Sequence, residues 1–176
     1  INSIAKSIQK KGYHEFAVSI TEEQIANLHE FAISNETKCI DISQKGVAYL
    51  PQKIKFDPTS PKSPRYQFES NTLVQNETVR EIVFDPTFRT IAARYLDCQP
   101  ILDIVTMWWS VPFNQKATAQ SAQMYHFDMD RFKFLKFFFY ITDVHSDNGP
   151  HCYIEGSHST IPKQARKDGR LKDDEL

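Results

Sequence analysis

The sequence predicts an α+β domain, mainly β, in which helices come first and consecutive strands follow. Up to residue 96 the apolar residues recur mostly at helical spacing, and from residue 101 onward three apolar runs alternate with turns. The 13 Phe and 7 Tyr residues suit a β-rich core. The 176 residues are enough for one compact domain, so we expect residues 1–176 to form a single domain built on a β-sandwich or barrel.

Two early helices are marked by their ends. Residues 4–12 carry a weak helical pattern that Gly12 closes, and residues 13–20 alternate enough to predict a short strand. Thr21 followed by Gln24 has the pattern of a capping box, in which the threonine caps the helix and the glutamine reaches back. The sequence therefore predicts a helix that begins directly after Thr21.

The next segment contains a proline-rich loop and two further helices. Residues 57–64 hold three prolines and allow neither a helix nor a central strand. Residues 71–83 have a helical composition. Asp85-Pro86 predicts the start of another helix, because proline in the first turn loses no hydrogen bond. We expect these helices to pack against a sheet.

Three strands are predicted in the second half of the chain. Residues 101–111 are apolar, β-branched and aromatic and end before Pro112, which is typical of a buried strand. Residues 134–141 predict a second buried strand. A turn at residues 147–150 leads into a third strand at residues 151–154.

Composition excludes several classes of partner. A formal net charge of -1, without a basic stripe, gives no reason to expect nucleic acid or an anionic membrane surface. No apolar run approaches the roughly 20 residues of a membrane helix. The three cysteines, Cys39, Cys98 and Cys152, lack zinc-site spacing and predict buried reduced thiols. We therefore expect a cytoplasmic protein.

His126 and Asp128 are the strongest candidate metal ligands. Alternate side chains of an extended segment share a face, so the imidazole and the carboxylate are expected to point the same way. This pair of ligands suits Fe(II), Mn(II) or Zn(II), and a 2-His-1-carboxylate iron site would need one more histidine. The later candidates are His145, His151 and His158. Each has an ordinary alternative, either a solvated turn or a hydrogen-bonded corner.

Four motifs in this order resemble the phytanoyl-CoA dioxygenase family. They are Gln123-x-x-His126-x-Asp128, then Tyr140-Ile141-Thr142-Asp143-Val144, then Asp147-Asn148-Gly149-Pro150, and finally Gly156-Ser157-His158. The resemblance extends upstream to residues 9–13, to the capping-box helix, to the Asp85-Pro86 helix and to the strand that ends at residues 111–112.

This resemblance implies a double-stranded β-helix, the cupin-like jelly roll, with N-terminal helices buttressing one sheet. It also implies an Fe(II) centre that uses 2-oxoglutarate and O2 to act on a small-molecule substrate. His126 and Asp128 would be the first two iron ligands. The carboxylate favours hydroxylation, with release of succinate and CO2, over halogenation, because iron halogenases of this group lack it.

The resemblance also places a cofactor pocket. The strand before the iron motif lines the pocket in the family, which here points to Met107 and Trp109, and Phe138 on the following strand would join them. Gln123, which opens the iron motif, completes this predicted cofactor-binding set. For Met107, Trp109 and Phe138 the alternative is plain core packing.

One part of the family pattern has no counterpart before Leu176. The family's distal iron histidine and its 2-oxoglutarate-binding arginine follow the Gly-Ser-His segment, whereas residues 163–176 are charged and have no strand pattern. We therefore expect the domain to be incomplete at its C-terminus, without the strands that close the barrel.

Two other functions compete with an oxygenase. A jelly-roll protein that binds a ligand without turnover would explain the missing histidine and arginine. Asp128 and Asp130 form a D-x-D pair of the kind that holds Mn(II) and a sugar nucleotide in glycosyltransferases. No β-α-β pattern precedes that pair, so this is the weakest of the three functions.

Overall fold

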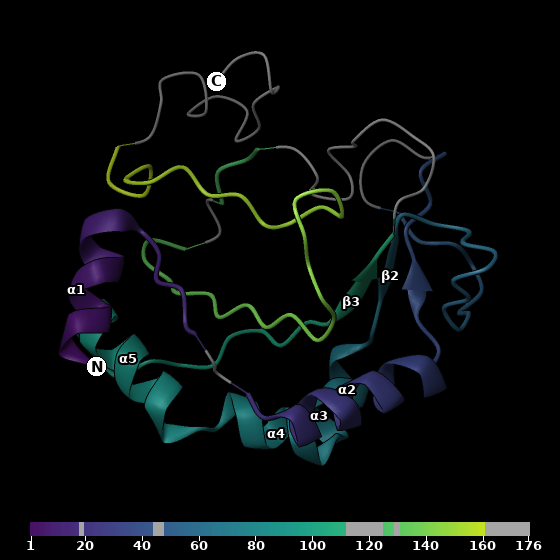
Figure 1. Cartoon of the computed structure of the whole chain (residues 1–176), viewed down its shortest axis with the longest axis horizontal. Coiled ribbons are helices and arrows are strands. Elements are labelled where there is room, and N and C mark those ends of the chain that lie inside the picture. Colours follow the sequence, from purple (N-terminus) through teal and green to yellow (C-terminus); the bar gives the residue numbers. More distant parts are fainter. Residues whose placement is uncertain (18–19, 44–47, 112–124, 129–130, 161–176) are drawn as a thin grey trace.

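The computed structural model describes residues 1–17, 20–43, 48–111, 125–128 and 131–160. The helices form an arc along one side of this structure, and a small antiparallel sheet lies at one end of it (Figure 1). Extended segments from the second half of the chain cross above the arc (Figure 1). Both predicted ingredients of an α+β fold are therefore present in the described part of the chain.

The first two helices begin or end where the sequence indicates. Helix α1 (Asn2–Lys11) ends at Gly12, which has a φ of 90° and donates its N–H to the carbonyl oxygen of Ile8 at 2.8 Å. Helix α2 (Glu22–Ser34) has the predicted capping box, with Thr21 N–H donating to Gln24 Oε1 at 3.0 Å. Gln24 N–H donates to Thr21 Oγ1 at 3.1 Å in return. Both features are confirmed.

The predicted helix over residues 71–83 is two helices. Helix α3 (Ser70–Gln75) and helix α4 (Glu77–Val83) are separated by Asn76. The Asn76 backbone is extended and its side-chain oxygen accepts the Val79 N–H at 3.0 Å, so a local cap replaces helical continuity. Helix α5 (Pro86–Leu96) begins as predicted, with Asp85 accepting the Thr87 N–H at 2.7 Å.

The described sheet has three short antiparallel strands in the order β1-β2-β3. They are β1 (Lys38–Cys39), β2 (Arg65–Gln67) and β3 (Trp108–Ser110). Tyr66 is opposite Cys39 on one side and opposite Trp109 on the other. The central strand is only three residues long, so it can pair with only three residues of the segment 101–111.

Most of the predicted strands are wrong for the described residues. Only Trp108–Ser110 of the segment 101–111 is a strand, and Ile101 is 89% exposed. Residues 134–141 and 151–154 are not strands, and neither are residues 13–17. Apolar alternation favours an extended backbone, but a strand also needs a neighbour to share its hydrogen bonds. Three short strands do not establish the double-stranded β-helix.

The side chains still alternate as a strand would place them. Residues 105, 107 and 109 are half-buried and 111 is buried, whereas 104, 106, 108 and 110 are exposed. In the later segment, residues 137, 139 and 141 are half-buried and residues 136, 138 and 140 are exposed. The buried set packs on the helices, since the Phe88 ring lies 5.1 Å from Phe137 and 5.3 Å from Phe139.

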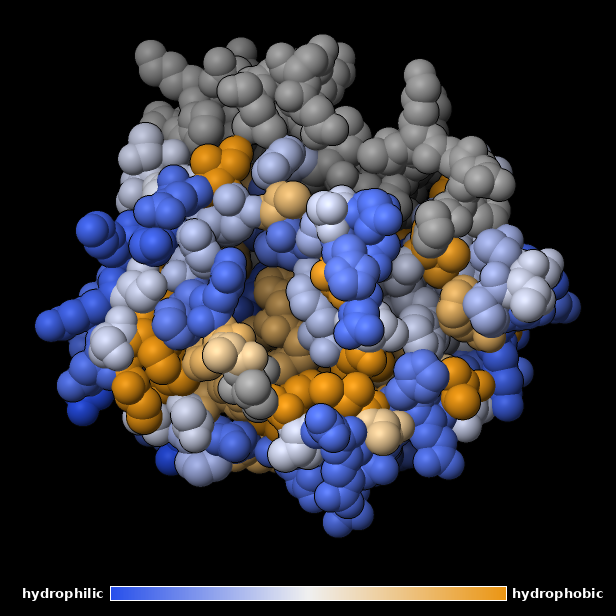
Figure 2. Space-filling view, in the orientation of Figure 1, coloured by the Kyte–Doolittle hydropathy of each residue, from blue (hydrophilic) through white to orange (hydrophobic). Residues whose placement is uncertain are grey.

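The main core lies between the helical arc and these extended segments. Its buried members come from α2, α3, α4 and the residue after β2: Leu28, Ala32, Phe68, Leu73, Val79 and Ile82. On the face shown in Figure 2, apolar residues remain visible across the lower middle, over the arc, within a hydrophilic rim. Burial is therefore uneven in the described structure, and large side chains such as Phe132 are fully exposed.

The Gly-Ser-His segment packs on the end of α1. Gly156 N–H donates to the Lys11 carbonyl oxygen at 2.7 Å, and His158 Nε2 lies 3.1 Å from the Gln9 carbonyl oxygen. A carbonyl only accepts, so Nε2 is the donor. The Tyr153 ring lies 5.6 Å from the Tyr13 ring. This arrangement is a hydrogen-bonded corner, and it ties His158 to the helix.

The sequence predicts no membrane-spanning helix and three buried cysteines. No helix within the described ranges is long and apolar enough to cross a membrane.

Of the three cysteines, Cys39 is buried, but Cys98 and Cys152 are exposed. The expected burial is wrong for the last two because both lie in parts of the chain that the helices do not cover: Cys98 follows α5, and Cys152 is in the extended segment before the corner.

Glu69 joins three parts of the fold through two lysines. Its carboxylate lies 2.8 Å from Lys38 Nζ on β1 and 2.5 Å from Lys53 Nζ on the following loop. Glu69 itself precedes the first turn of α3. Hydrogen bonds and charge attraction from Lys38 and Lys53 lower the pKa of Glu69 from 4.5 to about 2.

We predict that Glu69→Gln lowers the urea midpoint at pH 7 and that the difference from wild type disappears in acid. A carboxyl with a lowered pKa stabilises the fold above its unfolded pKa of 4.5, and this stabilisation is lost as the pH falls towards about 2. Urea unfolding at several pH values measures the difference, and added salt should reduce it at pH 7 because the groups are exposed. A pH-independent difference would contradict this role of Glu69.

We predict that Gly12→Ala destabilises the fold more than Gly149→Ala. Both glycines have positive φ, so each alanine carries a backbone cost of about 1 kcal/mol. A Cβ at Gly12 would lie 2.1 Å from the Tyr153 hydroxyl, whereas a Cβ at Gly149 would have nothing within 4 Å. Displacing Tyr153 adds about 1–3 kcal/mol. Chemical denaturation measures both variants, and equal losses would show that the corner does not pack on Gly12.

Candidate active site

His126 and Asp128 lie together in the described segment 125–128. His126 Nε2 is 3.5 Å from Asp128 Oδ1, and the two side chains are 31% and 32% exposed. The two residues are separated by one position, and the approach of their side chains places them on the same side, as the alternation predicts. Gln123, the first residue of the motif, lies outside the described residues.

Asp128 has a second partner. The Lys136 ammonium contacts Asp128 Oδ2, and the Lys136 side chain keeps 42% of its surface exposed. The two oxygens of one carboxylate therefore face different groups, the His126 imidazole at Oδ1 and the Lys136 ammonium at Oδ2. This contact brings the segment 134–141 against the candidate metal ligands.

The outward side chains of that segment also hold His151. The Phe138 ring stacks on the His151 ring with centroids 4.7 Å apart and an angle of 28°. The Tyr140 hydroxyl oxygen accepts the His151 backbone N–H at 2.8 Å. Lys136, Phe138 and Tyr140 are alternate residues, so one exposed side of the segment contacts both Asp128 and His151.

The pKa of His151 is affected by its burial and by the charges of His126, Lys136 and Asp128. Loss of hydration lowers the pKa of its imidazole from 6.5, and the charges of His126 and Lys136 lower it further, while Asp128 opposes them. The lowered pKa favours the neutral imidazole, which can accept a hydrogen bond or bind a metal.

The donor atoms suit a divalent metal, but they are few. Ligands about 2.1 Å from an ion and at 90–109° to each other lie about 3.0–3.4 Å apart, close to the separation of Nε2 and Oδ1. Within the described residues, no group of three or more His, Cys, Asp or Glu side chains could hold an ion. The described structure therefore brings together two candidate ligands.

The three later histidines have different surroundings. The His145 backbone N–H donates to Asn148 Oδ1 at 2.7 Å within the predicted turn, and His158 is bonded to α1. The pKa of His151 is affected by His126 and Asp128. Lys136 was not identified from the sequence, and Tyr140 was identified only as the first residue of a family motif, although the alternation along residues 134–141 was a signal that they share one side.

The predicted pocket residues fall into two groups. Met107 and Trp109 pack against the main core, and Trp109 Nε1 donates to the Ala32 carbonyl oxygen at 3.5 Å. Their contacts are those of core packing, and a cofactor role for them stays a prediction. Phe138 is 49% exposed and contacts His151, so it is the member of this set that lies beside the candidate site.

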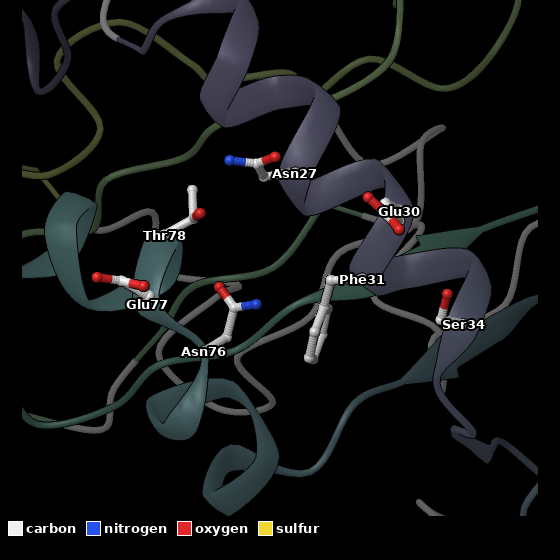
Figure 3. A pocket seen from close by; sticks show the side chains of 7 residues that line it. All are labelled: Asn27, Glu30, Phe31, Ser34, Asn76, Glu77 and Thr78. Carbon is white, nitrogen blue, oxygen red and sulfur yellow. The ribbon is translucent and has the colours of Figure 1, made fainter.

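A separate open pocket of about 340 Å³ lies between α2 and the junction of α3 and α4 (Figure 3). All but one of its lining residues are of polar type, and none is a predicted site residue: Asn27, Glu30, Phe31, Ser34, Asn76, Glu77 and Thr78. Asn76 already caps α4 with its side-chain oxygen. The pocket thus shares no residue with the His126–Asp128 pair.

Comparison with known proteins identifies the family to which this chain belongs. The sequence model of the family described as phytanoyl-CoA dioxygenase (PhyH) matches residues 51–175, which include β2, β3, α3 to α5 and the His126–Asp128 pair. Searches of curated proteins and of solved structures gave no match. The family match covers well over half of the chain, and the chain therefore belongs to the phytanoyl-CoA dioxygenase family, a family of Fe(II)/2-oxoglutarate-dependent oxygenases.

Proposed function

We propose that this chain is an Fe(II)- and 2-oxoglutarate-dependent dioxygenase that hydroxylates an unactivated C–H bond of a small or lipid-like metabolite. The reaction would consume O2 and convert 2-oxoglutarate to succinate and CO2. Family membership supports the reaction class. The observation that carries the proposal to particular residues is the 3.5 Å approach of His126 Nε2 to Asp128 Oδ1.

In this proposal His126 Nε2 and Asp128 Oδ1 hold the iron. When bound, Fe(II) supplies the oxidising chemistry with O2 and 2-oxoglutarate that no amino-acid side chain provides. The protein positions two ligands on one extended segment, where alternate side chains point the same way. Phe138 and Tyr140 hold His151 on the same side of their segment as Lys136, and the lowered pKa of His151 favours its neutral imidazole.

We further propose that residues 1–176 belong to one domain with the jelly-roll architecture of the family. The alternation of half-buried and exposed side chains over residues 105–111 and 137–141 supports this, since it is what two sheet-forming segments packed on helices would show. In this architecture the helical arc would be the layer of helices that supports one sheet (Figure 1).

A jelly-roll protein without catalysis is the second candidate. The observation that favours it is the absence, from the described part of the chain, of a third side chain able to complete a metal site. Such a protein would keep its fold in the presence of a chelator. The glycosyltransferase hypothesis gains no support, because Asp130 lies outside the described residues and Asp128 is paired with His126 and Lys136.

We predict that the full-length protein, as it is encoded, releases succinate from 2-oxoglutarate when Fe(II), ascorbate and O2 are supplied. His126→Ala should abolish this release because the variant loses one of two ligands on the same segment. His145→Ala is the matched control, since His145 lies in the turn bonded to Asn148 and should leave the rate unchanged. Succinate is measured by chromatography.

Three results would count against the oxygenase. The protein would bind no Fe(II) under anaerobic conditions, or it would release no succinate, or His126→Ala would retain the wild-type rate. The non-catalytic protein predicts the first two results together with an unchanged thermal midpoint on adding chelator. A sugar transferase would instead require Mn(II) and a sugar nucleotide and would be indifferent to 2-oxoglutarate.

A further inference from the structure

The Asp128 carboxylate is shared between a candidate metal ligand and a cation of the protein. Oδ1 faces His126 Nε2 at 3.5 Å, and Oδ2 contacts the Lys136 ammonium. Lys136 is four residues before Tyr140 on the segment whose exposed side also holds His151. Lys136 therefore reaches Asp128 from the segment that also contacts His151.

The Lys136 ammonium brings a positive charge to the carboxylate of a candidate ligand. Replacing Lys136 by an uncharged side chain would remove that charge from beside the pair. The affinity of an oxygen-containing site for a divalent cation rises with the negative charge of its ligands. Lys136 thus opposes the binding of any divalent ion at this pair.

We propose that Lys136 is a positioning residue that acts through Asp128: its ammonium, held at Oδ2, offsets the charge of the carboxylate whose Oδ1 faces His126, and so lowers the affinity of the His126–Asp128 pair for a divalent metal. This inference rests on the proposed function, because it concerns the same pair of ligands. Lys136 thereby sets how strongly the pair binds a metal, and it weakens the binding of every divalent ion.

Lys136 can be replaced without loss of the contacts that hold His151. The Lys136 side chain is 42% exposed, and its ammonium also lies 5.3 Å from the centroid of the Phe134 ring. The contacts with His151 are made by the Phe138 ring and the Tyr140 hydroxyl group. A variant at position 136 therefore changes the charge beside Asp128 and leaves those contacts in place.

The test uses Mn(II) alone as the probe, without 2-oxoglutarate or O2, so that its readout is binding and not activity. Lys136→Met removes the charge and keeps most of the length, and Lys136→Arg keeps the charge. Lys133→Met is the matched control, because Lys133 Nζ bonds to the Tyr95 carbonyl oxygen at 2.7 Å and not to Asp128. Calorimetry and the electron-paramagnetic resonance signal of free Mn(II) measure the affinity.

We expect Lys136→Met to bind Mn(II) about tenfold more tightly than wild type, with a difference that shrinks as salt is added. Lys136→Arg and Lys133→Met should bind like wild type. Adding His126→Ala to Lys136→Met should remove the gain, which shows that the ion sits at the pair.

Equal or weaker Mn(II) binding by Lys136→Met, with wild type still binding, would overturn this role of Lys136 and leave the proposed function intact. The same affinity gain in Lys133→Met would also overturn it, because the effect would then be one of general surface charge. If no protein binds Mn(II) at the pair, both this inference and the proposed metal site are wrong.

Discussion

The alternation of side chains along residues 136–141 connects the core of this structure to its candidate site. Phe137 and Phe139 contact Phe88 on α5, which fixes the segment against the helices. The residues between and beside them then have to face the other way. Lys136 meets Asp128 and Phe138 meets His151 for that reason. A shift of the segment by one residue would bury the lysine and expose the core phenylalanines.

Sequence reasoning succeeded where the relevant contacts are local. The capping box of Thr21 and Gln24 and the αL end of α1 at Gly12 each involve residues at most four positions apart. Their hydrogen bonds are satisfied within one turn of helix, so the pattern alone determines them. The break between α3 and α4 at Asn76 was not predicted. The cap that Asn76 forms is equally local, but the residues on both sides of it have a helical composition, which favours one continuous helix.

The strands were less predictable because a strand depends on a partner. Residues 101–111 have the composition of a buried strand, yet only the part opposite β2 is paired in the described structure. The same limit applies to the site. The pairing of His126 with Asp128 follows from their spacing, whereas Lys136 and His151 reach it from other segments. Composition could not show that Lys136 lies against Asp128 or that His151 lies against Phe138. The alternation of residues 134–141 did indicate which side chains of that segment share a side.

The corner on α1 has a consequence for the order of folding. The hydrogen bond between His158 and Gln9 joins residues 149 positions apart, and Gly156 and Tyr153 meet the same helix end. Contacts of such separation form late because they require closure of a long loop. Helix α1 also packs on α5, but its C-terminal carbonyls gain these partners only after the chain as far as residue 158 has been synthesised.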